Sequence, residues 1–414
     1  MTVREQAVLA KSAAASLAAA STQEKNRALA QIAQALDENR AAILKANERD
    51  IAQAKEQGMA KAMLDRLTLT DQRISGMISG VEDVIALEDP VGEFLDMGTR
   101  TEGLVIGRKR VPLGVVAIIY ESRPNVTVDA AVLCLKAGNT VILRGGKEAI
   151  HTNRALEAVM KAALKKSPLP EDAVHLVQDI SRESATALMG LRGLVDVLIP
   201  RGGGNLIRSV VEHAKVPVIE TGEGNCHVYI DGEADLEMGA KIIQNAKCSR
   251  PSVCNAAETL LVDKTIAAQF LPRAKALLDP CHVELRGDEE TCRILGDSVI
   301  PATEADYETE FLDYVLAIRV VDGIEEAMAH IARYSTSHSE CIVTESYTNA
   351  NRFLDQVDAA AVYVNASTRF TDGGVFGLGA EIGISTQKMH ARGPMGLHAL
   401  TSTKFVIYGA GQVR

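Results

Sequence analysis

A cysteine at position 254 stands in a setting that suits nucleophilic chemistry. The segment 245–255 is polar, prone to turns and contains one proline, and an apolar run follows it. The thiol is therefore expected on a bend between regular elements rather than in an apolar stripe. A thiolate attacks a carbonyl or acyl-phosphate carbon far better than a thiol, and a nearby cation or helix start lowers its pKa. Lys247 and Arg250 lie upstream, and a helix is expected to start near Ser252.

Two alternatives compete with Cys254 as the nucleophile. A single cysteine is more often a packed, inert side chain than a reactive one. In addition, Cys248 lies six residues earlier in the same polar segment. Local sequence does not separate the two cysteines, so both stay candidates at this point.

A polar string at 121–125 follows the apolar run 114–120, which is expected to form a strand. Ligands of wound α/β sheets bind at the carboxyl ends of the strands. The amide of Asn125 could donate a hydrogen bond to a developing oxyanion, together with the backbone N–H of the nucleophile. The alternative is a helix cap, because Asn is common just before an apolar helix.

A glycine turn after the expected strand 140–143 is a candidate phosphate site. It consists of Arg144, two glycines and Lys147. Backbone amides at the glycines and two cationic side chains would suit the 2′-phosphate of an adenosine ribose. An ordinary turn between a strand and a helix explains the same residues equally well.

A second glycine turn, at Arg201, Gly202 and Gly203, follows the expected strand 195–199. Its glycines would allow the backbone to approach a pyrophosphate or a nicotinamide closely. The GxGxxG fingerprint of dinucleotide-binding proteins is absent here. The cofactor is therefore either not a dinucleotide or is bound to a wound sheet in a less usual way.

Two carboxylates stand where they could serve catalysis or cofactor binding. Glu220 ends the expected strand 217–220 and could be a general base or a solvated carboxylate. Glu310, next to Phe311, could grip a ribose diol, although a surface turn is the commoner role for such a pair.

The pattern of apolar runs predicts an α/β fold with two wound blocks. Residues 3–88 are expected to be mostly helical, and 94–111 to form an extended ribbon or hairpin. From residue 112 onward, short apolar runs alternate with helical segments, which indicates parallel sheets covered by helices. The expected strands are 114–120, 140–143, 174–177, 195–199, 217–220 and 226–230, then 259–262, 283–285, 315–321, 341–344 and 360–364, and finally 403–408.

Length, charge and cysteine content limit the class of protein. With 414 residues the chain is long enough for two or three domains. Its net charge of −10, without clusters of basic and aromatic residues, argues against a nucleic-acid surface. Apolar runs stay well below the roughly 20 residues that span a bilayer, and the start has no compact signal region, so a cytoplasmic protein is expected. The cysteines are odd in number and none forms a CxxC pair, so neither disulfides nor a metal site is expected.

In this order, the segments resemble those of the aldehyde dehydrogenase superfamily, and the likeness covers essentially the whole chain. It is sharpest to the branch that reduces L-glutamyl 5-phosphate. The segments that carry the resemblance are long and specific, and lie at 110–116, 121–127, 141–148, 198–203, 250–255, 362–374, 376–381 and 390–397.

The resemblance implies an aldehyde dehydrogenase-like α/β fold with two wound domains and a small β element for oligomerisation. An NADP-binding domain is implied at 1–93 and 112–225, and a catalytic domain at 226–396. The oligomerisation element is implied at 94–111 and 397–414, which makes a homo-oligomer the expected state. The resemblance also accounts for the missing glycine fingerprint, because this superfamily holds its dinucleotide without the usual glycine contacts.

The resemblance also implies roles for single residues. Cys254 takes the nucleophile position and Asn125 the oxyanion position, while Lys147 and Glu310 take those of contacts to the adenosine ribose and the nicotinamide ribose. Glu220 takes the place of a water-activating glutamate in the hydrolytic members. An acyl-phosphate reductase needs phosphate rather than activated water, so Glu220 is expected to be turned away or mainly structural.

The implied reaction is the NADPH-dependent reduction of L-glutamyl 5-phosphate to L-glutamate 5-semialdehyde and phosphate through a thioester, the second step of proline biosynthesis from glutamate. Phosphate is already a good leaving group, so no metal is needed. The lability of an acyl phosphate, like the resemblance, implies glutamate 5-kinase as a partner. Charge indicates four residues that could bind the substrate or merely tie loops together: Arg123, Arg369, Asp372 and Arg392.

Two other functions stay open. A non-phosphorylating aldehyde dehydrogenase would oxidise its substrate without phosphate, and Glu220 is the best support for that activity. A catalytically silent scaffold or binding protein on the same fold would show no binding of NADPH.

Overall fold

The computed structural model describes residues 1–121 and 123–414, which divide into two compact units. The first unit consists of Met1–Thr221, Gly377–Gly383 and Pro394–Arg414, and the second of Gly222–Phe376 and Ile384–Gly393. Ser122, within the polar string after the first predicted strand, lies outside the described residues.

The first unit opens with helices, as the 3.6-residue spacing of its apolar side chains predicts. Its helices are α1 (Val3–Ala19), α2 (Thr22–Glu38), α3 (Arg40–Glu56), α4 (Lys61–Leu67), α5 (Asp71–Ala86), α6 (Pro124–Lys136), α7 (Ile150–Leu164), α8 (Arg182–Met189) and α9 (Gly204–His213). Thr2 and Ser21 begin α1 and α2 with capping boxes, which satisfy the first backbone N–H groups of each helix. The apolar face of α2, with Leu29, Ile32 and Leu36, is buried, and the helix packs on α5 and α7.

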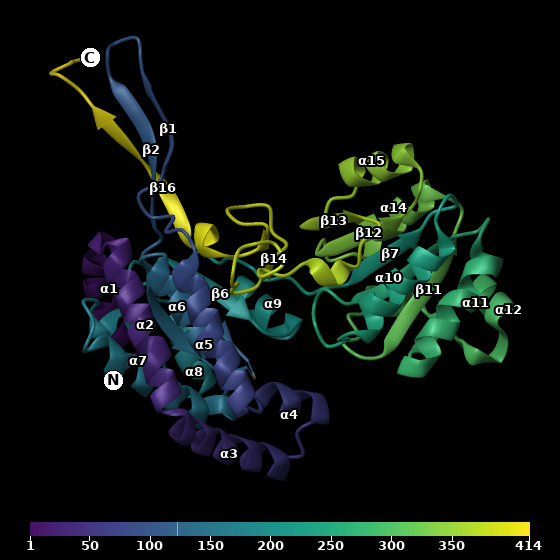
Figure 1. Cartoon of the computed structure of the whole chain (residues 1–414), viewed down its shortest axis with the longest axis horizontal. Helices are drawn as coiled ribbons and strands as arrows, with labels where there is room; N and C mark the ends of the chain where they lie inside the picture. Colours follow the sequence, from purple (N-terminus) through teal and green to yellow (C-terminus); the bar gives the residue numbers. More distant parts are fainter. Residues whose placement is uncertain (122) are drawn as a thin grey trace. The chain divides into compact units, whose positions relative to one another are not determined.

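A parallel sheet forms the core of the first unit, with α1, α6 and α7 packed against it (Figure 1). Within the described residues its strands follow the order β5 (Val174–Leu176), β4 (Thr140–Arg144), β3 (Val115–Tyr120) and β6 (Val197–Arg201). Every residue of β3 is buried, which suits the unbroken apolar sequence of a central parallel strand. Because the strands run in one direction, the turns that carry Asn125, Lys147 and Gly202 follow their carboxyl ends at one edge of the sheet.

The predicted strand at 217–220 is wrong. Val218 forms an isolated parallel bridge with Leu198 of β6, and the chain then leaves the sheet. The Ile219 N–H still donates to the Leu198 carbonyl, over 3.0 Å. Pro217 has no N–H to donate, so it cannot extend a ladder of hydrogen bonds.

A separate antiparallel sheet, called the ribbon sheet below, joins distant parts of the sequence. It contains β1 (Phe94–Thr99), β2 (Val105–Pro112) and β16 (Thr401–Tyr408), with β2 between the other two. Figure 1 shows it extending away from the helices of the first unit. The predicted ribbon and the predicted last strand therefore pair with each other, whereas their role in oligomerisation stays a prediction.

The second unit is built on a larger parallel sheet. In the part of the chain that the structure describes, its strands follow the order β10 (Ile300–Pro301), β9 (Glu284–Gly287), β11 (Val315–Val321), β8 (Ala257–Asp263), β7 (Cys226–Ile230), β12 (Ser339–Val343) and β13 (Ala361–Val364). Its helices are α10 (Leu236–Cys248), α11 (Ala267–Leu278), α12 (Glu289–Leu295), α13 (Glu304–Glu308), α14 (Ile324–Tyr334) and α15 (Tyr347–Gln356). The short strands β14 (Ile384–Ser385) and β15 (Gly393–Pro394) follow. The two parallel sheets confirm the predicted α/β fold class.

Helix α10 corrects the prediction for the segment 245–255. Asp235 caps its start by accepting the N–H groups of Glu237 and Met238, and the helix runs to Cys248. The residues 245–248, predicted to belong to a bend, form the last turn of this helix. The bend itself begins at Ser249.

Among the helices that the structure describes, none combines the length and apolar character that crossing a membrane requires.

Candidate active site

The predicted site residues are divided between the two units. The second unit holds Cys254, Glu310, Arg369, Asp372 and Arg392, and the first holds Arg123, Asn125, Arg144, Lys147, Arg201, Gly202, Gly203 and Glu220. The pairing of Cys254 with Asn125 therefore stays a prediction.

Cys254 lies on a turn between α10 and β8. Residues 249–256 form turns and bends rather than a helix, so the predicted helix start near Ser252 is wrong. The Ala256 N–H closes the turn by donating to the Val253 carbonyl over 3.0 Å. Cys254 is partly exposed, as a nucleophile that meets a substrate must be.

Cys248 has the surroundings of a structural cysteine. It is the last residue of α10 and packs against the hydrophobic core of the second unit. Burial, with Cys281 beside it, raises the pKa of the Cys248 thiol. A packed, protonated thiol is a poor nucleophile, so the geometry favours Cys254 over Cys248.

Asn255, the residue after Cys254, is anchored to the loop that follows β13. The side-chain Nδ2 of Asn255 donates to the Thr371 carbonyl over 2.9 Å. The Asn255 carbonyl in turn accepts from Thr368 Oγ1 over 2.7 Å. Both contacts join residues more than 100 positions apart, so the turn at Cys254 is fixed by tertiary structure and not by its own sequence.

Arg369 brings a positive charge close to Cys254. Its guanidinium donates to Asn255 Oδ1 and to Ser249 Oγ, on either side of the turn. Burial lowers the pKa of Arg369, and its charge interacts with those of Cys254 and Arg250. A cation near a thiol favours the thiolate. A contact between Arg369 and the substrate stays a prediction.

The other two candidates for substrate binding in this unit hold loops in place. Asp372 Oδ1 accepts the N–H of Gly374 over 2.9 Å. Arg392 Nη1 donates to Asp358 Oδ1 over 2.7 Å. Hydrogen bonds from Lys388 and then from Arg392 hold the pKa of the Asp358 carboxyl below its usual value. Their predicted contacts with a substrate stay predictions.

Glu310 is linked to the segment just before β7. One of its carboxylate oxygens accepts the N–H of Gly224 over 2.8 Å. Glu310 lies between α13 and β11, where Arg286 lies over the ring of its neighbour Phe311 at 5.2 Å. The contact with a nicotinamide ribose stays a prediction.

Asn125 sits in the first turn of α6 and is not its cap. The N-cap residue is Arg123, so the alternative of a helix cap at Asn125 is wrong. Its Nδ2 donates to Asp129 Oδ2 over 2.8 Å, one turn further along the helix. Burial raises the pKa of Asp129 to about 6, although Asn125 and the charge of Arg201 act against that rise. One N–H of the amide thus fixes its orientation, which leaves the other as the potential oxyanion donor.

Lys147 borders a cavity of about 280 Å³ after the end of β4. Its lining combines two further cationic or titratable side chains, His151 and Arg154, with the carboxylates of Asp50 and Glu148. The position at the carboxyl end of a parallel strand and the mixed, polar lining fit the ribose end of a nucleotide.

Arg144, by contrast, forms hydrogen bonds to nearby backbone carbonyls. Its guanidinium donates to the carbonyls of Ile180 (2.9 Å) and Ser181 (3.0 Å), and burial lowers its pKa. These contacts tie the loop after β5 to the end of β4. A direct contact between Arg144 and a cofactor stays a prediction.

The glycine turn after β6 is held by the carboxylate of Glu121, the residue that follows β3. The Gly203 N–H donates to Glu121 Oε2 over 3.0 Å. A Cβ at Gly202 would lie 2.5 Å from that same oxygen, so the close approach of Glu121 requires a glycine. Glu121 therefore occupies the start of α9, where a phosphate was one predicted ligand. Arg201, the last residue of β6, pairs in register with Tyr120 of β3.

Glu220 lies in the segment that leaves the first sheet. It is partly buried, and the hydroxyl of its neighbour Thr221 donates to the Pro200 carbonyl over 2.6 Å. Its predicted role as a structural rather than basic residue stays a prediction.

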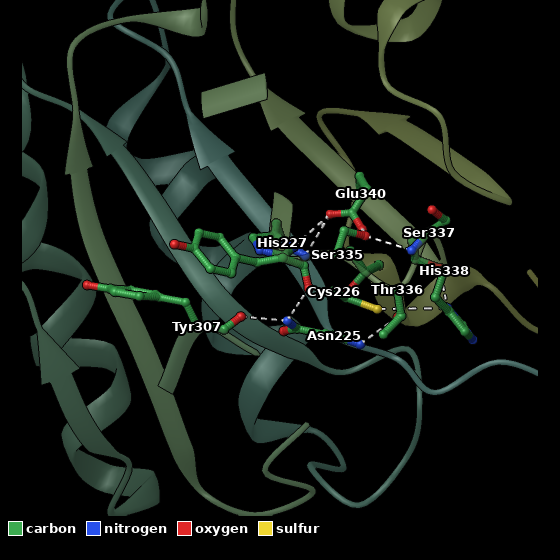
Figure 2. A network of polar contacts seen from close by, with 12 residues as sticks. Asn225, Cys226, His227, Tyr307, Ser335, Thr336, Ser337, His338 and Glu340 are labelled. Atoms are coloured by element: carbon green, nitrogen blue, oxygen red, sulfur yellow. Dashed lines mark hydrogen bonds and ion pairs between the residues drawn. The ribbon is translucent and has the colours of Figure 1, made fainter. Parts of the chain in front are cut away.

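The structure adds a buried polar network next to Cys226 that sequence reasoning missed (Figure 2). Asn225 Nδ2 donates to the carbonyls of Tyr307 (2.7 Å) and Tyr334 (2.8 Å). Glu340 Oε2 accepts the backbone N–H of His227 over 2.9 Å, and both side chains are fully buried. The available signal was a polar residue inside each of two apolar strands, because buried polar groups require partners.

Known proteins of one family resemble this chain in both sequence and structure. The sequence model of the aldehyde dehydrogenase family matches residues 1–293. Gamma-glutamyl phosphate reductase of Carboxydothermus hydrogenoformans is 61% identical over 98% of this chain and 97% of its own. The same enzyme from Caldanaerobacter subterraneus subsp. tengcongensis is 56% identical, over the full length of both chains.

Solved structures show the same similarity. The crystal structure of gamma-glutamyl phosphate reductase from Thermotoga maritima superposes with a TM-score of 0.97 at 51% identity, covering 100% of both chains. An acetylating aldehyde dehydrogenase from Geobacillus thermoglucosidasius, at 18% identity, has a TM-score of 0.73 over 100% of this chain and 97% of its own. The predicted aldehyde dehydrogenase-like fold is therefore confirmed.

Proposed function

The chain belongs to the aldehyde dehydrogenase family and, within it, to the gamma-glutamyl phosphate reductases, and on this premise we propose how it works. It reduces L-glutamyl 5-phosphate to L-glutamate 5-semialdehyde and phosphate, the second step of proline biosynthesis from glutamate. The observation that carries this activity is identity of 56–61% with enzymes of that name over nearly the whole chain.

Cys254 is the nucleophile of the proposed mechanism. Its thiolate attacks the γ-acyl carbon of the substrate, and phosphate leaves with the bonding electrons of the C–O bond, which gives a thioester on Sγ. The charge of Arg369 near the turn supports the thiolate form. Phosphate departs readily as a dianion, so no acid is required to protonate it.

Asn125 and the backbone N–H of Cys254 hold the oxyanion during this attack. Each such donor contributes roughly 3–4 kcal/mol to the stabilisation of a tetrahedral intermediate in comparable sites. The contact between Asn125 and Asp129 supports this role, because it turns one N–H of the amide away and presents the other. NADPH, when bound, would supply the hydride that converts the thioester carbon to a thiohemiacetal. Its collapse would release the aldehyde and leave Cys254 as the thiolate.

NADP(H) is the proposed form of the nicotinamide cofactor. The cavity after β4 would receive the adenosine ribose, with Lys147 and Arg154 as the cations nearest to a 2′-phosphate. Glu310 would hold the nicotinamide ribose. Arg144, Arg201 and Gly202 would shape the part of the cofactor site that lies in the first unit, through the loops that they hold.

Substrate recognition is assigned to four charged side chains. Arg369 and Arg392 are proposed to bind the carboxylate or phosphate, Asp372 the α-ammonium group, and Arg123 either anion from the first unit. Because acyl phosphates hydrolyse readily, a glutamate 5-kinase is the proposed supplier of the substrate, and the chain is proposed to act as a homo-oligomer in the cytoplasm.

The decisive experiment replaces Cys254 with Ala. We expect the phosphate-dependent reduction of NADP⁺ by glutamate semialdehyde to fall by roughly 10³-fold or more, because the covalent route is lost. Binding of NADPH, followed by its fluorescence, should be retained. The same assay without phosphate separates this reaction from that of a non-phosphorylating aldehyde dehydrogenase.

The matched control is Cys248→Ala, which removes a thiol from the end of α10. This variant should keep its activity to within a few-fold. Loss of turnover in Cys248→Ala together with activity in Cys254→Ala would overturn the assignment of the nucleophile. Equal turnover with and without phosphate would overturn the proposed reaction itself.

A further inference from the structure

We propose that Cys226 is a positioning residue, whose thiol holds the main-chain carbonyl of Cys254 and thereby sets the direction of the nucleophile. The inference rests on the proposed function, in which Cys254 attacks the substrate. Cys226 itself touches neither the substrate nor the cofactor in this proposal.

The contact joins the start of β7 to the turn that carries the nucleophile. Cys226 is the first residue of β7 and is fully buried. Its Sγ donates to the Cys254 carbonyl over 3.2 Å, well within the usual range for a thiol donor. His338 Nδ1 lies 3.8 Å from the same sulfur atom. Figure 2 marks this contact with a dashed line.

The thiol is suited to remain a donor. Burial, with the charge of Glu340 as the next cause, raises the pKa of Cys226 well above the usual value for a thiol. Cys226 therefore stays protonated across the pH range in which Cys254 is expected to act as a thiolate. The two cysteines thus have opposite roles, one as a hydrogen-bond donor and one as a nucleophile.

Gly224 shows how closely this segment packs on the nucleophile. A Cβ built on Gly224 would lie 1.4 Å from the Cys254 carbonyl oxygen, so only glycine fits there. The Gly224 N–H is fixed by Glu310, and the hydroxyl of Thr336 donates to the Glu223 carbonyl. The segment 223–226 is therefore a fixed support rather than a loose neighbour.

The residues that flank Cys254 in the sequence are held as well. Ala256 N–H donates to the Val253 carbonyl, and Thr368 anchors the Asn255 carbonyl. With the Cys254 carbonyl held by Cys226, rotation about the Cα–C bond of Cys254 is restricted. The side chain then leaves the backbone in one direction, which reduces the entropy lost when the thiolate adopts the attacking geometry.

The test compares three variants of the full chain. Cys226→Ala removes the donor, Cys226→Ser keeps a donor in its place, and Cys341→Ala is the matched control. Cys341 is likewise buried, on the neighbouring strand β12, but its Sγ contacts the carbonyl of Ile342 and not the turn.

For Cys226→Ala we expect kcat to fall about five-fold with the KM for glutamate semialdehyde changed less than two-fold, which corresponds to the loss of one net hydrogen bond. Cys226→Ser should recover at least half of the lost kcat. Cys341→Ala should keep kcat within two-fold, since any loss there reports packing alone.

A second measurement does not depend on the substrate. The rate at which iodoacetamide alkylates Cys254 is followed by mass spectrometry, with fragment ions that separate Cys254 from Cys248. Cys226→Ala should be alkylated about three-fold faster than the unmodified chain, because its nucleophile samples more directions, even though turnover falls.

The outcomes separate the two proposals. If the unmodified chain shows no phosphate-dependent turnover, the proposed function fails, while the alkylation rates still test the contact. An unchanged kcat and alkylation rate in Cys226→Ala would overturn the positioning role. So would an equal loss in Cys341→Ala, or a Cys226→Ser variant as slow as Cys226→Ala.

Discussion

At the scale of single residues, the buried carboxylate of Asp129 lowers the stability of the folded chain. Its contact with Asn125 in the proposed oxyanion site explains why a carboxylate lies there. Its carboxylate accepts the amide N–H of Asn125, and burial raises the pKa of Asp129 from 3.8 to about 6. Between these two values the folded chain binds more protons than the unfolded chain. The contribution of Asp129 to the free energy of unfolding therefore falls as the pH rises from about 4 to 6. Above pH 6 the carboxylate is charged and the full loss of stability persists.

Replacing Asp129 with Asn should therefore stabilise the chain at neutral pH. The neutral amide has nearly the same shape and loses the desolvation cost of the charge. We expect the free energy of unfolding at pH 8 to rise by about 1–3 kcal/mol, and the difference from the unmodified chain to shrink towards zero near pH 4. Urea unfolding of both chains at pH 4 and pH 8 measures this difference in the free energy of unfolding. A less stable variant at pH 8 would show that the charge of Arg201 outweighs the cost of burial.

The individual residues also show which parts of the candidate site the sequence could predict. The polar setting of Cys254 predicted a bend, as the structure has it, whereas Asn125, after the predicted strand, lies in the first turn of α6. The sequence could not separate Cys254 from Cys248, because the difference lies in the packing of α10 on a distant core. It also could not predict Cys226 beside Cys254, since that contact joins the start of β7 to a turn 28 residues further along the chain.

At the scale of elements, the turns after the strands depend on close packing at glycines. Gly145 follows β4 and supports the turn that leads to Lys147. A Cβ at Gly145 would lie 2.2 Å from Asn153 Nδ2 and 3.1 Å from the buried Tyr120 ring and hydroxyl. By contrast, Gly76 lies in the exposed part of α5, with nothing within 4 Å of a built Cβ.

The same change at these two glycines should have opposite effects. Gly145→Ala should destabilise the chain by about 1–3 kcal/mol, as overpacking does, and raise the Kd for NADPH as the turn moves. Gly76→Ala should stabilise it by about 0.5–1 kcal/mol, because alanine favours a helix interior. Thermal unfolding and NADPH titration of both variants measure these effects. A Gly145→Ala variant with unchanged Kd would show that the turn does not shape the cofactor site.

The elements that the sequence predicted correctly are those whose apolar pattern is uninterrupted. The central strands β3 and β8 and the amphipathic helix α2 belong to this group, because burial imposes their pattern directly. The last turn of helix α10 is predicted as part of a bend because it is rich in polar residues. The strand expected at 217–220 failed because the chain leaves the sheet after one bridge, at Val218. The register of β16 against β2 depends on pairs such as Phe405 with Arg108, nearly 300 residues apart, which no local pattern specifies.

At the scale of the whole molecule, the ribbon sheet carries several large apolar side chains that are exposed. In β16, Phe405 is 67% exposed, Ile407 57% and Tyr408 54%, and Met97 of β1 is 51% exposed. Contiguous apolar patches of this kind mark interaction sites, and a small sheet is stabilised when another surface packs on it. A second copy of the chain is the partner that we expect, in line with the oligomerisation element that the sequence implied.

Substitution of Phe405 and Ile407 by Lys tests this expectation. The two residues alternate along β16 and so share one face, where two ammonium groups would oppose burial in an interface. We expect light scattering coupled to size-exclusion chromatography to give the mass of an oligomer for the unmodified chain and a mass nearer to that of one chain for the double variant. Leu354→Lys, at a position on α15 that is 43% exposed, is the control and should keep the mass of the oligomer. A double variant that keeps its oligomeric mass would show that the interface does not include this face of β16. An unmodified chain that is monomeric would show that the exposed face does not bind a second copy.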